Sequence, residues 1–203
     1  KNLVKGLLNE QAQVNKYLSA LDQLSQVKLP QTDDGSTRLL LPPLLTAETS
    51  ISIKSLIAPL IERAEARANL QGRKWFSPSH WPIWMESRSI SEGVIAEIVA
   101  NLLENAFRYS PSQASIGIEV TEQGICVWDE GTPINEEERE KIFEKGFRGE
   151  SGSKMSGSGI GLALARDLAR QVGGNLRLVV NPSKFKNSLP ESGNAFIFNL
   201  ELE

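Results

Sequence analysis

The sequence predicts an α+β fold, a two-layer sandwich in which helices cover one face of a mixed β-sheet, preceded by one long N-terminal helix. Three segments carry apolar residues at helical spacing: 54–70, 89–110 and 162–172. Four shorter segments are alternating or continuously apolar, which is typical of strands: 115–120, 125–128, 176–180 and 196–202. Residues 1–27 place apolar side chains at heptad-like spacing, which predicts the N-terminal helix.

The amino-acid composition limits which kinds of binding partner the protein can have and in which cellular compartment it is expected. The chain has 203 residues, 40% of them hydrophobic, and a net charge of -3, so it can bury a sizeable core but offers no broadly cationic surface to nucleic acid or membrane. A single cysteine, Cys126, and a single histidine, His80, exclude an intrachain disulfide and a Cys/His metal cluster. The longest apolar run, 39–45, contains two prolines and is too short to span a bilayer. We expect a cytoplasmic fragment without nucleic-acid or membrane contacts, which leaves open a membrane tether elsewhere in the full-length protein.

The first 50 residues differ in character from the rest of the chain. The heptad-like pattern of 1–27 predicts either a helix that needs a partner helix or an amphipathic helix packed on its own domain. The segment 30–50 contains three prolines and an Asp-Asp-Gly-Ser cluster, which indicates a linker. We therefore divide the chain into a helix over 1–29, a linker over 30–45 and a main domain over 46–203.

Local signals set several helix boundaries. Two pairs of residues have the spacing of a helix capping box: Ser89 with Glu92, and Asn135 with Glu138. The first pair predicts the start of a helix that ends near Ser110, and the second predicts a short helix through Phe143. The segment 81–85, Trp-Pro-Ile-Trp-Met, is expected to be extended.

The helix predicted over 89–110 carries polar residues away from the centre of its apolar stripe. Four of them fall within a sector of roughly 80° at 100° per residue: Glu97, Asn101, Asn105 and Arg108. A solvated face is the alternative, but such a face usually carries Lys and Glu pairs, whereas paired asparagines lower helix propensity. Amide oxygens suit magnesium, and arginine pairs with phosphate, so the sector is a candidate metal-phosphate surface.

Glycines mark a second candidate site. Gly157, Gly159 and Gly161 directly precede the helix 162–172, where they allow positive φ and close approach of the backbone to an anion. This pattern predicts a phosphate cradle, with a merely flexible loop as the alternative. Leucines at 162 and 164 exclude the dinucleotide-binding fingerprint, and the serine at 158 excludes a P-loop, which requires lysine there.

A third candidate lies at the end of the strand 125–128. Asp129 can accept a hydrogen bond from an exocyclic amine such as adenine N6, and Gly131 beside it leaves room for a flat base. An ordinary Asp-x-Gly turn is the alternative. The following segment, 143–159, is rich in Gly, Ser, Lys and Arg and is predicted to form a mobile lid. In this lid Arg148 and Lys154 are either phosphate contacts or exposed solubilising charges.

Four motifs occur in the order typical of one family: EIVANLLENAFRYS resembles the N box, DEGTPI the G1 box, IFEKGFRG the F box and GSGIGLALA the G2 box. With them the chain resembles, over about 46–203, the catalytic and ATP-binding domain of sensor histidine kinases, in the superfamily shared with Hsp90, gyrase B and MutL. The resemblance implies the Bergerat-type fold, a mixed sheet with helices on one face, with ATP and Mg²⁺ as cofactors.

The resemblance also implies residue roles. Asn105 would coordinate Mg²⁺, Asn101 would line the metal-phosphate site, and Asp129 would bind adenine N6 beside Gly131. Glu97, a weaker candidate for a base or polariser, joins Asn101 and Arg108 as the catalytic set. Phe143 and Phe147 would anchor the lid. The remaining residues implied to contact nucleotide are Arg108, Tyr109, Ile134, Arg148, Lys154, Gly157, Ser158, Gly159, Ile160, Gly161 and Leu162.

Three features depart from the family pattern. Pro133 stands where the G1 box usually has a second glycine, which changes the expected hinging of the lid. Arg108 replaces the more usual lysine and keeps its charge with a different geometry. Residues 1–27 resemble the second helix of the family's dimerisation hairpin and contain no histidine, so the phosphoacceptor would lie upstream or be missing; His80, in a Pro- and Trp-rich context, is a poor candidate.

The expected function is therefore the ATP-dependent kinase core of a two-component system. The γ-phosphoryl group of Mg-ATP would pass to a histidine outside this fragment and then to the receiver domain of a response regulator, with the protein a homodimer through the N-terminal hairpin. The alternatives are a related ATPase or serine kinase of the anti-sigma type, and a catalytically silent nucleotide-binding or dimerisation module.

Overall fold

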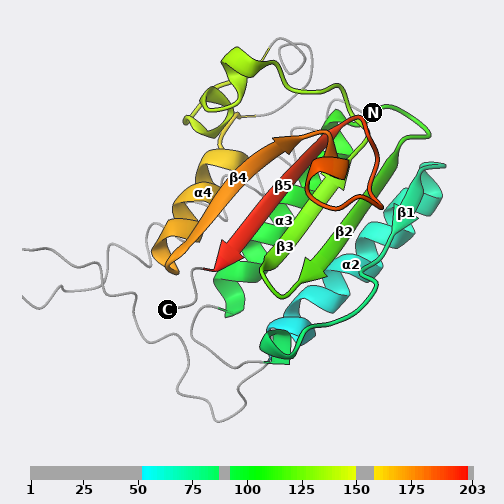
Figure 1. Cartoon of the computed structure of the whole chain (residues 1–203), viewed down its shortest axis with the longest axis vertical. Helices are drawn as coiled ribbons and strands as arrows, with labels where there is room; N and C mark the ends of the chain where they lie inside the picture. The colour runs from blue at the N-terminus through cyan, green and yellow to red at the C-terminus, as the bar shows by residue number, and fades with distance from the viewer. Residues whose placement is uncertain (1–51, 87–91, 150–157, 201–203) are drawn as a thin grey trace, which may run out of the picture. The chain divides into compact units, whose positions relative to one another are not determined.

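Five strands form one mixed sheet in the order β1-β2-β3-β5-β4. They are β1 (Lys74–Phe76), β2 (Ser115–Thr121), β3 (Gly124–Asp129), β4 (Gly174–Val180) and β5 (Asn194–Leu200). Only β1 and β2 are parallel; the other neighbours are antiparallel (Figure 1). The computed structural model describes residues 52–86, 92–149 and 158–200, which belong to one compact unit spanning Ser50–Glu203.

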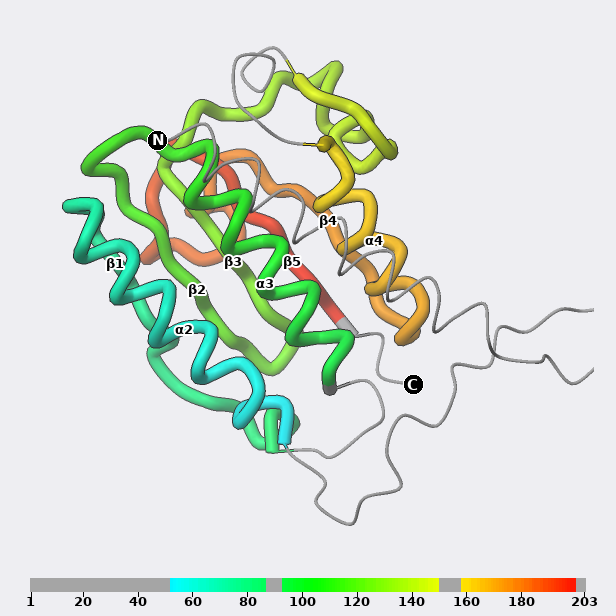
Figure 2. Tube along the Cα trace, turned by 180° about the vertical axis from the view of Figure 1, so that it is seen from behind, coloured from blue at the N-terminus to red at the C-terminus, as the bar shows by residue number. Residues whose placement is uncertain are grey.

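Three helices cover one face of this sheet: α2 (Ile53–Leu70), α3 (Glu92–Tyr109) and α4 (Gly161–Gln171). Seen from behind the sheet, α3 runs between α2 and α4 (Figure 2), and it packs against both neighbours. The apolar stripe of each helix points at the strands because burial of these side chains drives the packing. The largest fully buried side chains of this layer are Ile57, Met85, Ile95, Ile98, Leu102, Ile116, Ile118, Ile125, Leu176 and Phe198.

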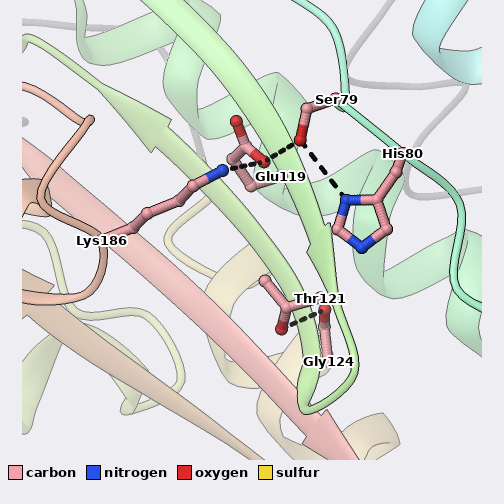
Figure 3. A network of polar contacts seen from close by, with 6 residues as sticks. All are labelled: Ser79, His80, Glu119, Thr121, Gly124 and Lys186. Atoms are coloured by element: carbon pink, nitrogen blue, oxygen red, sulfur yellow. Dashed lines mark hydrogen bonds and ion pairs between the residues drawn. The ribbon is translucent and has the colours of Figure 1, made fainter.

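The other face of the sheet carries a smaller core. Cys126, Trp128 and Ile197 on β3 and β5 pack with Leu189 from the β4–β5 connection. Figure 3 shows how polar contacts tie this connection to the strands: Lys186 Nζ lies 3.0 Å from Glu119 Oε2 on β2. Both faces are therefore covered, which explains why β2 and β3 are buried along nearly their whole length.

A short segment before α3 also reaches the sheet on this side. Ser79 Oγ donates to Glu119 Oε2 over 3.4 Å and lies 3.5 Å from Nδ1 of His80, an exposed side chain (Figure 3). Further along, Trp84 packs against the helix-side core instead, and its Nε1 donates to Thr121 O over 2.9 Å. His80 is thus a surface residue among structural contacts.

The predicted fold class is confirmed, and the three helices and four strands predicted over 54–70, 89–110, 162–172, 115–120, 125–128, 176–180 and 196–202 are present in order as α2, α3, α4, β2, β3, β4 and β5. The sheet has five strands rather than four, because β1 is a three-residue edge strand, too short for an alternating pattern to be visible. In the part of the chain with described coordinates, no helix is long and apolar enough to cross a membrane. The predicted helix 1–29, the linker 30–45 and Ser89 of the first capping box lie outside the described residues.

Two local predictions are wrong. The segment 81–85 is not extended: a 3₁₀ turn, Ile83–Glu86, forms because Met85 N donates to Pro82 O and the turn buries Met85 completely. The short helix expected from Asn135 through Phe143 is replaced by two 3₁₀ turns, Glu136–Glu138 and Lys141–Phe143. The side chain of Asn135 caps neither turn, since the chain bends to bury Phe143 instead of continuing along one axis.

Candidate functional site

The polar sector of α3 faces the first residue of α4. A Cβ atom placed on Gly161 would lie 3.4 Å from Asn101 Oδ1 and 3.9 Å from Asn105 Nδ2. Any larger side chain at position 161 would fill the space in front of the two amides. Asn101, Asn105 and the N-terminus of α4, which the sequence separates, therefore form one surface.

The two amides differ in their hydrogen bonding. Asn101 Nδ2 donates to Glu97 O over 2.9 Å and to Glu97 Oε1 over 3.4 Å, which holds Asn101 Oδ1 towards α4. The Asn105 Nδ2 atom is buried and has no hydrogen-bond partner among the described residues. An unpartnered buried N–H donor is costly in a folded protein, so Asn105 Nδ2 is suited to a bound hydrogen-bond acceptor such as a phosphate oxygen.

Asp129 is buried at the end of β3, with 2% of its surface exposed. Its Oδ1 accepts a hydrogen bond from Gly131 N over 2.7 Å. Burial raises the pKa of the Asp129 carboxyl to about 6, against the opposing effects of hydrogen bonds from Gly131, Asn194 and Ser110 and of the Arg73 charge. The carboxylate is thus desolvated yet still ionised at neutral pH, which makes it a strong hydrogen-bond acceptor.

Gly131 links this carboxylate to the end of α3. A Cβ atom placed on Gly131 would lie 2.5 Å from Asp129 Oδ1 and 3.1 Å from the carbonyl oxygen of Tyr109. Tyr109 follows Asn105 by one helical turn, or about 6 Å, and Asn101 by about 12 Å. The site is therefore elongated along α3, with amides and the α4 N-terminus at one end and a buried carboxylate at the other.

We predict that Gly131→Ala lowers the free energy of unfolding by about 1–3 kcal/mol, because the added methyl group displaces the Asp129 carboxylate or the Tyr109 carbonyl. The matched control is Gly93→Ala in α3, where nothing lies within 4 Å of the new Cβ and alanine favours the helix. Chemical denaturation of the two variants measures the difference. Equal stability changes would contradict the close packing of Gly131.

The segment that leads to α4 is held at both ends. Gly146 N donates to Gly159 O over 3.1 Å, and Gly159 has a φ of +69°, where a side chain would collide with the Phe147 carbonyl. Phe143 is buried, meets Phe196 edge-to-face at 6.5 Å, and has the Arg166 guanidinium 4.4 Å above its ring. These contacts fix the base of the predicted lid on α4 and the core.

The structure brings some of the predicted site residues together and leaves others apart. Asn101, Asn105 and Gly161 meet, as do Tyr109, Asp129 and Gly131. Arg108 instead lies 3.6 Å from Glu104 on its own helix. Of the remaining predicted residues, Phe147, Ile160 and Leu162 are partly buried, Arg148 and Ser158 are exposed, and Lys154 and Gly157 lie outside the described residues.

Two contributors were missed by sequence reasoning. Asn194 on β5 is paired with Asp129 across the sheet, and its side chain accepts from Ile134 N and donates to Thr132 O, both over 3.0 Å. These two bonds hold the backbone beyond Gly131. Ser110 is the other missed residue, 5% exposed beside Asp129. A polar residue at the first position of an apolar strand was the available signal for Asn194.

Comparisons with known proteins identify the family of this chain. Residues 91–203 match the family model described as histidine kinase-, DNA gyrase B-, and HSP90-like ATPase. The chain is 38% identical over 144 residues to the sensor histidine kinase Hik2 of Thermosynechococcus vestitus. The aligned residues cover 67% of this chain and 36% of that protein. The sensor-like histidine kinase SenX3 of Mycolicibacterium smegmatis is 34% identical over 109 residues, which are 49% of this chain and 28% of the length of SenX3.

Solved structures share the fold. The mycobacterial sensor histidine kinase MprB superposes with a TM-score of 0.58 at 25% identity, over 74% of this chain and 95% of that one. The nucleotide-free catalytic domain of histidine kinase ThkA superposes with a TM-score of 0.57 at 24% identity, over 75% of this chain and 95% of that one. The chain spans about a third of the length of the curated relatives named above.

Proposed function

The chain belongs to the histidine kinase-, DNA gyrase B- and HSP90-like ATPase family, and from this premise we propose that residues 46–203 are the catalytic ATP-binding domain of a sensor histidine kinase. In this proposal residues 1–29 are part of a dimerisation hairpin and 30–45 a linker. The fragment works in the cytoplasm, where ATP is available, and its partners are a second copy of the chain and the receiver domain of a response regulator.

One observation carries the proposal: α3 places two amides at the N-terminus of α4, and the end of β3 places the buried Asp129 carboxylate near Tyr109, one to two helical turns further along α3. In this proposal Asp129 accepts a hydrogen bond from adenine N6, and the base lies beside Gly131 and Tyr109, which pack closely against the carboxylate. The N–H groups at the start of α4, an 11-residue helix, face the phosphates together with Gly159 and Gly161.

Magnesium would be held by Asn105 through its Oδ1 atom, while its buried Nδ2, which has no hydrogen-bond partner among the described residues, would donate to a phosphate oxygen. A neutral amide oxygen suits an ion whose charge is balanced mainly by nucleotide phosphates. Such an ion neutralises the triphosphate and helps to align it. Glu97 fixes the Asn101 amide, so that Asn101 Oδ1 stays directed at the α4 N-terminus. Arg108 adds a positive charge at this end of the site, and Phe143 and Phe147 hold the lid base in place.

In the proposed reaction, an imidazole nitrogen outside this fragment attacks the γ-phosphorus, the bond to the β–γ bridging oxygen breaks, and ADP leaves. Such transfers depend on positioning and charge neutralisation more than on covalent chemistry by the protein. The residues described here bind and align the donor, and Glu97, whose carboxylate accepts from Asn101 Nδ2 over 3.4 Å, would polarise the incoming imidazole. The phosphoryl group would then pass to an aspartate of the response regulator.

The test combines binding and transfer. We expect this chain to bind ATP and to discriminate against GTP, which presents a carbonyl acceptor where adenine presents N6. In the full-length protein, label from γ-labelled ATP should be acid-labile and base-stable, as for phosphohistidine. Equal affinity for ATP and GTP, or none for either, would contradict the site. Acid-stable label would instead indicate a serine kinase, and ATP binding without label a silent module.

A further inference from the structure

A single carboxylate joins two arginines from different helices beside the proposed phosphate site. Glu104 Oε2 lies 2.6 Å from Arg67 Nη1 on α2, and Glu104 Oε1 lies 3.6 Å from Arg108 Nη2 one turn along α3. The two contacts use different oxygens, so both arginines engage the carboxylate at the same time. The Glu104 charge is therefore shared between α2 and the nucleotide side of α3.

The two contacts are not equivalent. Arg67 makes a short charge-assisted hydrogen bond, and its guanidinium lies 4.4 Å above the ring of Phe107, which in turn stacks on Trp75. The Arg108 contact exceeds hydrogen-bond distance and is an i,i+4 pair between half-buried side chains, so it is the weaker of the two by its length. Arg67 is held firmly on Glu104, whereas Arg108 is held loosely.

The helix geometry gives Arg108 a second position. It follows Glu104 by four residues and Asn105 by three, and both spacings place side chains next to each other on a helix surface. Arg108 can therefore lie towards Glu104 and α2, or towards Asn105 and the α4 N-terminus. Only the second position brings its guanidinium to the phosphates.

We propose that Glu104 is a positioning residue that keeps Arg108 on the α2 side of the site when no nucleotide is bound, and that Arg67 sets the strength of this hold by sharing the Glu104 carboxylate. The inference rests on the proposed function, since it concerns the same site. When a triphosphate binds, Arg108 turns to the phosphates and Glu104 keeps Arg67 as its partner, so no carboxylate is left unpaired. Residues of α2 that never touch the nucleotide thereby modulate its affinity.

Substitutions of Glu104 and of Arg67 are expected to change the affinity for Mg-ATP in opposite directions. Glu104→Gln releases Arg108 and should lower the Kd for Mg-ATP about threefold, whereas Arg67→Gln leaves the whole carboxylate to Arg108 and should raise it about threefold. The control is Arg63→Gln, one turn earlier on α2, whose exposed side chain bonds to Pro59 O in its own helix. It removes the same charge and should leave the Kd unchanged.

The double variant Arg67→Gln/Glu104→Gln decides between a shared carboxylate and simple charge effects. If Arg67 acts through Glu104, its substitution has no further effect once Glu104 is neutral, and neither substitution has an effect in an Arg108→Gln background. Isothermal titration at fixed ionic strength gives the affinities, and melting temperatures show that each variant is folded. Additive effects in the double variant would overturn the inference while leaving the proposed function intact. Absence of ATP binding by the unmodified chain would instead overturn the proposed function.

Discussion

Asp129→Asn is expected to lower the affinity for ATP on the order of 100-fold while the domain stays folded. The wild-type carboxylate can accept from Gly131 N with Oδ1 and from adenine N6 with its other oxygen. Asparagine has one acceptor oxygen, so its amide nitrogen would face N6, a donor against a donor. Glu62→Gln, the same chemical change on an exposed residue of α2, should leave the affinity unaltered.

The pH profile of binding tests the same carboxylate. Because burial raises the pKa of Asp129 to about 6, and only the ionised form is a strong acceptor for N6, the affinity should be constant above pH 7 and fall about tenfold per unit below pH 6. The Asp129→Asn variant reports any titration of the triphosphate itself. A constant ratio of the two affinities between pH 5 and 8 would contradict the assignment of Asp129 to the adenine contact.

The same raised pKa has a consequence for stability. A carboxyl that prefers its neutral form in the folded state contributes stability that is fully present below about pH 4 and is lost as the pH rises through about 6. At pH 7.5 the buried charge costs on the order of 3 kcal/mol relative to an ordinary carboxyl. Between pH 4 and 7.5 the unfolding free energy of Asp129→Asn should therefore rise relative to wild type, as denaturant titrations can measure.

Asn105→Ala is expected to remove the magnesium-dependent part of ATP affinity, a loss of roughly 10–100-fold. In wild type, magnesium should tighten ATP binding; in the variant, the Kd should be nearly the same with magnesium and with EDTA. The variant should also be at least as stable as wild type, because alanine favours the helix and a buried unpartnered amide is removed.

The matched control for this substitution is Asn69→Ala, an exposed asparagine near the end of α2. It changes the same side chain in the same kind of element and should leave the magnesium dependence intact. An Asn105→Ala variant that keeps the full magnesium effect would show that the ion is held elsewhere. A variant that fails to melt cooperatively would show that the amide is needed for folding, against the expectation above.

Much of the fold was predictable because its longer elements have strong local patterns. The apolar stripe of α3 follows from the requirement that one face of the helix be buried, and the alternation of β2 places Ile116, Ile118 and Val120 together in the helix-side core. The misses are short elements whose shape depends on distant partners. β1 exists because Lys74–Phe76 pairs with Ser115–Gly117 of β2, and the 3₁₀ turn Ile83–Glu86 exists because Met85 fills the core.

Taken alone, the sequence determined which residues could form a nucleotide site: the polar sector of α3, the glycines before α4, and Asp129 beside Gly131. These are local patterns, and they specify backbone conformation and which face of an element is apolar. Only the tertiary structure decided the environment of each group. The pKa of Asp129, the burial of Asn105 Nδ2 without a hydrogen-bond partner among the described residues, and the division of Glu104 between Arg67 and Arg108 all depend on burial and on contacts between elements.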